Sequence, residues 1–485
     1  HRDLHSFPTR RSSDLFNCIV TVAKDSNLIF SSSISDLNEA FKWSKNTALS
    51  YAHDGTDPVG FWYEAALPNR EAFCMRDIAH QSIGGEILGL SNHNYNMMIK
   101  FAENISASKD WCTYWEINKN DKPAPVDYFN DEQFWYNLPS NFDVVQACFK
   151  LYEWTGNKEY LYNPVFINFY EKTLYDYIKV WKLETENLLT RSTHMNTELP
   201  FKEETKFNGN RGIPSYIESE SGFSLAGDLV ASIYAACDAY SKILTIKGDT
   251  KRAEFFRNKA QNYKSFINDK FWNNKENYFN FFWSSIEGDF IMKNTPTAGE
   301  TYYVWFDALE TPTKSQTTIN RVLVSENNVE NLSHLPLLLY RYRMPEKAYE
   351  MLYTLRNHDR KEYPEASFGL IEGITVGLMG IQPKASMNII QTLPQLISNE
   401  QWAEISNLSI FSSLVNIRHE GNYKSIFVNN SEKNLNWRAS FYGEYDKIYL
   451  NGKECSPKYA VDVMGNIYSY IDTEVKHGER QICNI

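Results

Sequence analysis

Residues 223–270 read FSLAGDLVASIYAACDAYSKILTIKGDTKRAEFFRNKAQNYKSFINDK, and they predict the unit from which the fold is built. In the first half, apolar residues recur every three or four positions, which is the spacing of one face of an α-helix. These residues are Leu229, Ile233, Ala236, Ala239, Tyr240 and Ile243. The sequence Lys247-Gly248-Asp249-Thr250 then supplies a glycine that ends one helix and an Asp-Thr pair that begins another. We therefore predict two consecutive helices, 223–247 and 249–270, that form a hairpin.

The same helical pattern recurs through most of the chain. The first predicted helix begins near Asp36 and contains Leu37, Ala40 and Phe41. Further helices are predicted at 76–89, 93–107, 140–155, 159–181, 299–309, 313–324, 331–342, 345–357 and 367–380. The total is about twelve helices in six consecutive hairpins.

Long loops at 108–139, 182–222 and 272–298 interrupt these hairpins. Loops of this length inside a compact domain are usually functional. They are rich in Trp, Tyr, Asn and acidic residues, which is typical of the rim of a binding site.

The pattern changes near residue 384, where short segments of β-rich or alternating character begin. Asn451-Gly452 is a strong signal for a β-hairpin turn. We predict that residues 384–485 form a small β-sandwich with a packing role.

The N-terminal residues are predicted to be foreign to the protein. Residues 7–15, FPTRRSSDL, are the translation of a common short-read sequencing adapter. We therefore expect residues 1–15 to be an artefact joined to a truncated gene, and residues 16–34 to be a remnant of the truncated N-terminal region. Residues 35–383 would then be the main, helical domain. Because the true N-terminus is missing, localisation stays open, although a periplasmic or secreted protein is suspected.

Composition excludes several classes of protein. Of 485 residues, 42% are hydrophobic and 22% are charged, which indicates a soluble globular chain with more than one domain. Apolar runs stay far below the roughly 18 residues needed to cross a membrane, so we predict no membrane span. The net charge of −11 and the lack of a basic cluster argue against a nucleic-acid partner. Composition does not predict the oligomeric state.

Cysteine and aromatic content point to a carbohydrate substrate without a metal or cofactor. Seven cysteines are scattered without a CxxC pair or zinc-ligand spacing, so we predict no metal, no disulfide framework and no cofactor. Aromatic residues make up 15% of the chain, with 12 Trp and 31 Tyr. Sugar rings stack on aromatic faces, so this content is typical of carbohydrate binding, although a large aromatic core would have the same composition.

The segment 57–81, DPVGFWYEAALPNREAFCMRDIAHQ, concentrates candidate substrate-binding side chains. An Arg-Asp pair at a helix N-terminus can bind neighbouring sugar hydroxyls through its donors and acceptors, or it can be an ordinary capping salt bridge. The candidates in this segment are Trp62, Tyr63, Glu64, Arg70, Arg76, Asp77, His80 and Gln81. The long loops add aromatic candidates that could instead be core anchors, namely Trp111, Trp115, Trp135, Tyr136 and Tyr216.

Hydrolysis of a glycosidic bond needs two carboxyl groups on opposite sides of the bond. Glu218 and Glu220 lie on a loop beside Tyr216, where desolvation suits a general acid, and we choose Glu218 for that role. Glu365 follows Pro364 at the start of the last predicted helix, and we choose it as general base. Glu372 lies seven residues on, on a similar face, and is the alternative base. Each of these could instead be a solvated loop residue or a charge matched to a helix end.

Two of these segments carry a resemblance to a known family. Residues 72–81, AFCMRDIAHQ, resemble the W-x-R-D-S-x-x-Q type motif of six-hairpin glycosidases such as the bacterial exo-α-mannosidases, and residues 41–51, FKWSKNTALSY, resemble their first barrel helix. Cys74 and Ile78 replace the Trp and Ser of the motif, and the paired-Asp motif of the mannosidases is not found. The resemblance implies a mainly α fold: an (α/α)6 toroid of six helical hairpins followed by a small C-terminal β-sandwich. It also implies that Arg76 and Asp77 bind the terminal sugar and that hydrolysis is inverting.

The sequence therefore predicts a glycoside hydrolase that is inverting and exo-acting on a terminal sugar of an oligo- or polysaccharide. One alternative is a polysaccharide lyase on the same toroid, for which Tyr216, His194, Asn196 and Arg191 are candidate groups. The other is a glycan-binding protein without catalysis.

Overall fold

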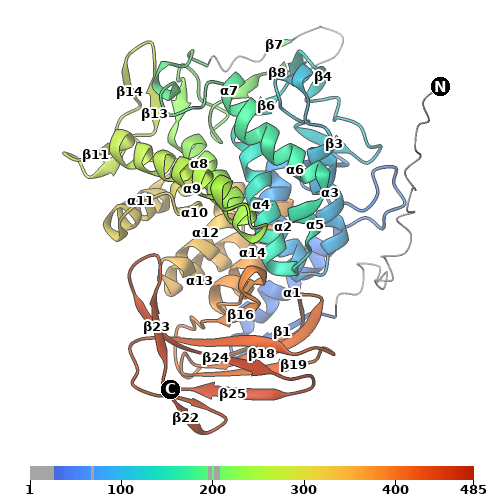
Figure 1. The fold of residues 1–485 in the computed structure, drawn as a ribbon, viewed down its shortest axis with the longest axis vertical. Coiled ribbons are helices and arrows are strands. Elements are labelled where there is room, and N and C mark those ends of the chain that lie inside the picture. The colour runs from blue at the N-terminus through green and yellow to red at the C-terminus, as the bar shows by residue number, and fades with distance from the viewer. Residues whose placement is uncertain (1–26, 67–69, 195–198, 201–207) are drawn as a thin grey trace.

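The computed structural model describes residues 27–66, 70–194, 199–200 and 208–485. The predictions for residues 1–15, for residues 16–26 and for Asn196 lie outside these ranges. Helices dominate the described chain up to Leu378, and strands dominate from Gln382 to the C-terminus (Figure 1). The predicted helical region and the β-rich C-terminal region are both confirmed.

The predicted helices form, with ends that differ by a few residues from expectation. They are α1 Ser35–Ser50, α2 Met75–Ile87, α3 Ser91–Glu103, α4 Pro139–Thr155, α5 Glu159–Tyr162, α6 Pro164–Glu171, α7 Ile178–Val180, α8 Gly227–Ile246, α9 Thr250–Phe266, α10 Thr301–Trp305, α11 Pro312–Val324, α12 Val329–Arg341, α13 Pro345–Arg356 and α14 Pro364–Glu372. Three π-helical segments extend or join them: Lys172–Tyr177 between α6 and α7, Ile267–Phe271 after α9, and Gly373–Leu378 after α14.

Every second helix packs into an inner ring. In chain order α2, α4, α8, α10, α12 and α14 each contact the next, and α14 contacts α2, which closes the ring. The remaining helices pack around this ring: α1 lies against α14, α3 against α2, α9 against α8, α11 against α10, and α13 against α12. Along the chain, outer and inner helices therefore alternate.

The start of α8 shows how tightly the ring is packed. A Cβ added at Gly227 would lie 1.6 Å from the Tyr303 hydroxyl oxygen, and Tyr303 itself is completely buried. Only glycine therefore fits where α8 meets α10.

Among the described residues, α8 is the one helix long and apolar enough to cross a membrane. Within the candidate window, 72% of the residues are buried inside the protein, because α8 is part of the inner ring.

The three long loops contain short strands and lie at the end of the ring opposite the C-terminal region (Figure 1). Their strands are β3 Glu116–Asn118, β4 Tyr128–Asn130, β5 Gln133–Phe134, β6 Tyr136–Asn137, β7 Leu199–Pro200, β8 Asn208–Gly209, β9 Arg211–Ile213, β11 Trp272–Asn273, β12 Tyr278–Phe279, β13 Phe282–Ser284 and β14 Asp289–Ile291. Two more strands lead directly into inner helices, β2 Ala72–Cys74 into α2 and β10 Leu225–Ala226 into α8. Strand pairing joins loops that are distant in sequence, since β6 pairs with β9.

The C-terminal region consists of two sheets. The seven-stranded sheet has the order β1-β17-β18-β19-β25-β21-β22, and the five-stranded sheet has the order β15-β16-β20-β24-β23. Their strands are β1 Ile29–Ser32, β15 Gln382–Lys384, β16 Ile389–Thr392, β17 Trp402–Ile410, β18 Ser413–Glu420, β19 Lys424–Asn429, β20 Leu435–Tyr442, β21 Ile448–Leu450, β22 Lys453–Cys455, β23 Lys458–Val461, β24 Ile467–Val475 and β25 Arg480–Asn484.

Two features of these sheets bear on the sequence predictions. Asn451 and Gly452 both have positive φ and connect β21 to β22, so the predicted hairpin turn is confirmed. Strand β1 precedes the first helix but pairs antiparallel with β17, with Ile29 opposite Ser406. The beginning of the described chain is therefore an edge strand of the C-terminal sheet.

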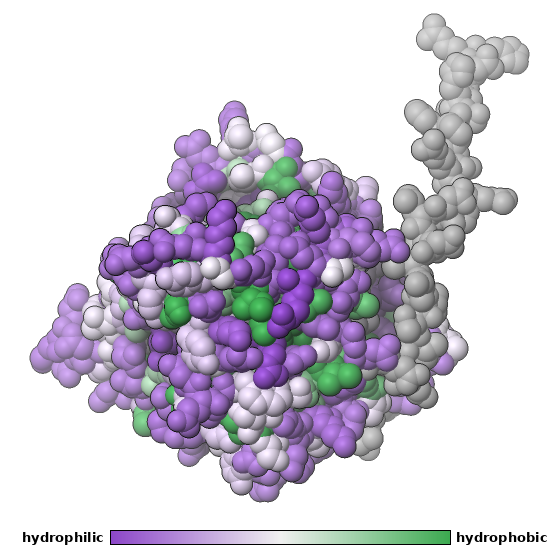
Figure 2. All heavy atoms as spheres, turned by 90° about the horizontal axis from the view of Figure 1, so that it is seen from below, coloured by the Kyte–Doolittle hydropathy of each residue, from purple (hydrophilic) through white to green (hydrophobic). Residues whose placement is uncertain are grey.

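The lower face of the molecule in Figure 1 is seen directly in Figure 2. Hydrophobic residues there lie in small groups among hydrophilic ones, which is the pattern of a surface in contact with water (Figure 2).

Candidate active site

Arg76, in the first turn of α2, is the centre of a buried charged cluster. Its Nη1 donates to Glu218 Oε1 at 3.0 Å, and its Nη2 donates to Glu330 Oε2 at 3.1 Å. The Arg76 side chain is 9% exposed, whereas those of Glu218 and Glu330 are 32% and 22% exposed. One guanidinium therefore joins two carboxylates that come from the loop before α8 and from the first turn of α12.

Asp77 and Glu365 lie next to this guanidinium. Tyr363, directly before α14, donates its hydroxyl to Asp77 Oδ2 at 3.0 Å, and Arg76 Nε lies 3.6 Å from Asp77 Oδ1. Burial raises the pKa of Asp77 to about 7, although Arg76 opposes the shift. Burial, and then the charges of Asp77 and Glu330, raise the pKa of Glu365 well above its usual range.

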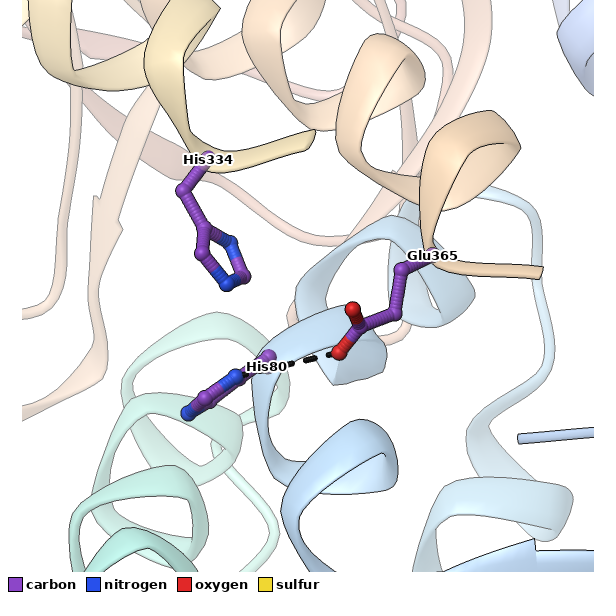
Figure 3. Close-up of side chains that lie close together, drawn as sticks. All are labelled: His80, His334 and Glu365. Carbon is purple, nitrogen blue, oxygen red and sulfur yellow. Dashed lines mark ion pairs between the residues drawn. The ribbon is translucent and has the colours of Figure 1, made fainter. Parts of the chain in front are cut away.

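Two histidines lie one helical turn further along the ring axis. His80 follows Arg76 on α2, and His334 follows Glu330 on α12, each by four residues. His80 Nε2 is 3.6 Å from Asp143 Oδ2, and His80 Nδ1 is 3.8 Å from Glu365 Oε1. Figure 3 shows His80, His334 and Glu365 pointing toward one another from three helices.

Aromatic rings line the cluster. Tyr216 stacks on Tyr302 with ring centroids 3.7 Å apart, and its hydroxyl donates to Asp143. Trp305 lies 4.6 Å from the His334 ring, and Trp115 faces the Arg76 guanidinium at 5.6 Å. These faces could stack against the apolar face of a sugar ring.

The inner helices all contribute residues from their N-terminal ends to this end of the ring. Arg76, Asp228, Glu330 and Glu365 lie in the first turns of α2, α8, α12 and α14, Asp143 begins the second turn of α4, and Tyr302 lies in α10. Helix N-termini carry partial positive charge and favour carboxylates nearby. The ring therefore gathers acidic groups at one mouth.

The loop that carries Glu218 is held by Asp228. Ser215 donates its hydroxyl to Asp228 Oδ2 at 2.7 Å, and the backbone N–H of Tyr216 donates to the same oxygen at 2.9 Å. Asn137 Nδ2 donates to the Ser215 carbonyl at 2.8 Å. Glu218 is therefore positioned by buried groups even though its own side chain reaches solvent.

A pocket of about 490 Å³ adjoins this loop. Glu220 lines it, together with Ile217, Asn328 and Asn331. Asn331 follows Glu330 directly, so the pocket flanks both carboxylates bound to Arg76. Glu220 thus borders the cluster without being one of the Arg76 partners.

Several predicted substrate-binding residues are instead core residues with their own partners. Trp62 and Tyr63 are completely buried, and they donate to Asp57 Oδ2 at 2.7 Å and to Asn94 Oδ1 at 2.6 Å. Two more predicted residues bond inside the protein. Gln81 Nε2 donates to the Glu64 carbonyl at 3.2 Å, and the Tyr136 hydroxyl donates to Asn141.

Other predicted residues are not hydrogen-bond or ion-pair partners of Arg76. Arg70 forms a second, neighbouring cluster, with Glu116 at 2.9 Å and Asp127 at 3.2 Å, and the charge of Asp127 acts on Glu218. Trp111 and Trp135 are partly buried, and Trp111 faces Lys172 at 4.4 Å.

Glu372 ends α14, nearly two turns from Glu365, so it lies toward the far end of the ring. Burial raises its pKa to about 7, and Lys150 opposes that shift.

Of the groups considered for lyase chemistry, Arg191 is already occupied. It is buried and donates to the carbonyl oxygens of Trp181 at 2.9 Å and Ser224 at 2.7 Å. The backbone N–H of His194 donates to the Phe223 carbonyl at 2.7 Å.

About half of the residues in this cluster were not predicted from the sequence. The missed residues are Asp143, Tyr302, Trp305, Glu330, His334 and Tyr363. Asp143, Tyr302, Glu330 and His334 lie in the first two turns of inner helices. A search for polar residues at the start of every second predicted helix could have found them.

Comparisons with known proteins place the fold. No protein-family model and no curated protein matches the chain. Among solved structures it is similar to an α-L-rhamnosidase from Dictyoglumus thermophilum, with a TM-score of 0.58 and 12% identity over 95% of this chain. It is also similar to a protein from the human microbiome described as a kojibiose phosphorylase (TM-score 0.53, 9% identity, 93% of this chain) and to a GH78 family rhamnosidase of Bacillus sp. GL1 (TM-score 0.51, 11% identity, 83% of this chain).

These similarities confirm, at the level of the fold, the resemblance to six-hairpin glycosidases. The chain spans 50% of the length of the Dictyoglumus protein, 67% of the phosphorylase-like protein and 40% of the Bacillus protein. The similar structures are carbohydrate-processing enzymes.

Proposed function

We propose that the chain is a glycoside hydrolase that releases a terminal sugar with inversion. We take its catalytic domain, residues 35–383, as an (α/α)6 toroid of six helical hairpins, followed by a β-sandwich at 384–485. The closed inner ring, the alternation of inner and outer helices and the fold of the similar structures support this architecture. One observation carries the functional proposal: a single buried guanidinium binds two carboxylates at the mouth of that ring, with further acids beneath it.

The sugar would bind where Arg76 and Asp77 meet the aromatic wall. Arg76 supplies donors and Asp77 an acceptor for neighbouring hydroxyls, which is the pairing that a sugar diol requires. The stacked pair Tyr216–Tyr302 and the indole of Trp305 supply apolar faces. The few solvent-accessible acids at the mouth suit a site that takes one end of a glycan, because the inner ring is filled with side chains below it.

Glu218 is our proposed general acid. Burial raises its pKa, although Arg76 opposes the shift, and its partial exposure lets it regain a proton from solvent. It would donate that proton to the glycosidic oxygen as the bond from that oxygen to the anomeric carbon breaks.

Glu365 is our proposed general base. It would take a proton from a water molecule as the oxygen of that water attacks the anomeric carbon from the opposite face. Inversion requires the two carboxyl groups to be ~6.5–9.5 Å apart across the substrate. Glu365 lies on α14 and Glu218 on the loop before α8, so the two carboxyl groups come from different elements of the ring, which suits such a separation.

The test compares the wild type with Glu218→Gln and Glu220→Gln on a panel of aryl glycosides. Glu220 is the matched control, because it is on the same loop and lines the neighbouring pocket without contacting Arg76. Loss of the general acid should lower kcat about 10²–10⁴-fold. The loss should be smallest for leaving groups such as 2,4-dinitrophenol, which need no protonation. Equal activity of Glu218→Gln and the wild type on poor leaving groups would remove Glu218 from catalysis.

A further inference from the structure

Three buried side chains that could hold a metal ion meet beneath the proposed sugar site. His80 comes from α2, His334 from α12 and Glu365 from α14, and their candidate ligand atoms all lie within 4.8 Å of one another (Figure 3). The two imidazole rings are perpendicular, with centroids 4.9 Å apart. The exposed fractions are 6% for His80, 4% for His334 and 2% for Glu365.

The ligand atoms have no hydrogen-bond partner. Both ring nitrogens of His80, Nε2 of His334 and Oε1 of Glu365 are buried and unpaired. Buried polar atoms almost always have a partner, and a native group without one indicates a bound water, ion or ligand. One unpaired atom from each of the three side chains can face a common point, which indicates that something binds between them.

The charge around this point favours a cation. The cations whose charges act on His80 and His334 are Arg76 and Lys150. Arg76 is the guanidinium of the cluster, and it faces several acids. These acids are Asp77, Asp143, Glu218, Glu330 and Glu365.

We propose that His80, His334 and Glu365 bind a divalent transition-metal ion of the zinc type. Two imidazole nitrogens and one carboxylate oxygen are the three-ligand set of open zinc sites, in which water takes the fourth position. Metal–ligand bonds of ~2.0–2.2 Å need these atoms to approach by tenths of an ångström to about an ångström, which side-chain rotation allows. Asp143, 3.6 Å from the other ring nitrogen of His80, is placed to orient that ring, as carboxylates do for metal-bound histidines.

The proposed ion would be at odds with the sequence-based prediction that the chain holds no metal. That prediction rested on the lack of closely spaced Cys and His residues. Here the three ligands come from helices that are far apart in the sequence and adjacent only in the closed ring.

The role of the ion rests on the proposed function, whereas its binding does not. A metal ion lowers the pKa of its bound water, and that water releases a proton to solvent. The resulting hydroxide oxygen would attack the anomeric carbon while Glu218 protonates the departing oxygen, and Glu218 would then regain a proton from solvent. With the ion bound, Glu365 would act on the nucleophile as a metal ligand and would no longer take the proton itself.

Metal binding is tested on the full chain after dialysis against EDTA. Calorimetric titration with ZnCl₂ should show one site per chain, and Zn²⁺ should raise the Tm. Co²⁺ should give visible d–d bands of a nitrogen- and oxygen-ligated site. His80→Gln, His334→Gln and Glu365→Gln should each weaken Zn²⁺ binding about a hundredfold or more. His358 is a half-buried histidine on the loop before α14, and His358→Ala is the matched control, which should bind like the wild type.

The outcomes separate the ion from the proposed reaction. Stoichiometric binding lost in the three variants but kept in His358→Ala supports the site, whether or not a glycoside is cleaved. Folded variants, identified by a wild-type Tm in EDTA, that still bind Zn²⁺ would overturn it. So would a wild type that shows neither heat of binding, Tm shift nor Co²⁺ bands, even if it hydrolyses glycosides with full rate in EDTA.

Discussion

Replacing Arg76 by Met should lower the stability of the folded protein and abolish its activity. The pH dependence of the stability loss should show that it comes from the charge of Arg76. The substitution removes two charge-assisted hydrogen bonds, to Glu218 at 3.0 Å and to Glu330 at 3.1 Å. Each such bond contributes about 1.5–3 kcal/mol when buried. Because the two carboxylates are 32% and 22% exposed, water recovers part of this energy. We expect a net loss of about 2–4 kcal/mol at neutral pH, just below the range for a fully buried pair.

This loss should depend on pH. Burial already raises the pKa of Glu218 above its ordinary value of 4.5, and Arg76 opposes that shift, so removing Arg76 raises the pKa further. A carboxyl whose folded-state pKa is raised loses stability as pH rises above the unfolded value. The gap between the variant and the wild type should therefore be large at pH 7.5 and small near pH 4.

The assay is thermal unfolding at both pH values, with activity measured at a temperature where both proteins are folded. The Tm should fall on the order of 5 °C at pH 7.5. Arg418→Met is the matched control, because Arg418 also binds two carboxylates, Glu404 and Glu420, and lies over a tryptophan, Trp402, but in the C-terminal sheet. It should lose some stability and keep its activity. A Tm loss that is equal at both pH values would refute the charge argument and assign the role of Arg76 to packing on Trp115.

Three further predictions concern single side chains. Burial raises the pKa of Glu86 from 4.5 to about 7, so Glu86 costs up to ~3 kcal/mol of stability as pH rises through this interval. Glu86→Gln should therefore flatten the pH dependence of unfolding between about pH 4.5 and 7, and an unchanged slope would contradict the assigned shift. Gly227→Ala should cost about 3 kcal/mol or more, because the new Cβ overlaps the buried Tyr303, and near-wild-type unfolding in urea would show that α8 can move. Tyr363→Phe removes the hydrogen bond to Asp77 and should lower kcat/KM about tenfold with little change in Tm, whereas unchanged kinetics would separate Asp77 from substrate binding.

Local pattern was enough to predict the helices. The hairpin of α8 and α9 followed from apolar spacing and from the Gly248-Asp249 stop and start, and Asp249 does cap α9 by accepting from the Arg252 N–H. The turn at Asn451-Gly452 followed from residue type alone. Both depend on contacts within a few residues, which is why the sequence displays them.

The site depended on long-range closure, and the sequence displayed it only in part. Arg76, Asp77, Glu218 and Glu365 were found because they stand in unusual local contexts, at helix starts and in a Gly/Ser-rich loop. His334 and Glu330 lie in an ordinary amphipathic helix and become site residues only when α12 packs beside α14 in the ring.

The aromatic predictions show the limit of composition. Trp62 and Tyr63 match a sugar-binding pattern but are completely buried, with their polar atoms bonded inside the protein. A tryptophan at the rim of a site and a tryptophan in the core look alike in the sequence, and only their neighbours in the folded structure distinguish them.

The central claim is that this ring hydrolyses a glycosidic bond. The most direct measurement is proton NMR of the wild-type chain with a panel of glycosides and oligosaccharides, uronates included, in which the anomeric signals of the first product are followed in time. Our account predicts that one terminal sugar is released and that its first-formed anomer is opposite to that of the substrate. Release with the same anomeric configuration, an unsaturated product that absorbs in the ultraviolet, or binding without turnover across the panel would contradict it.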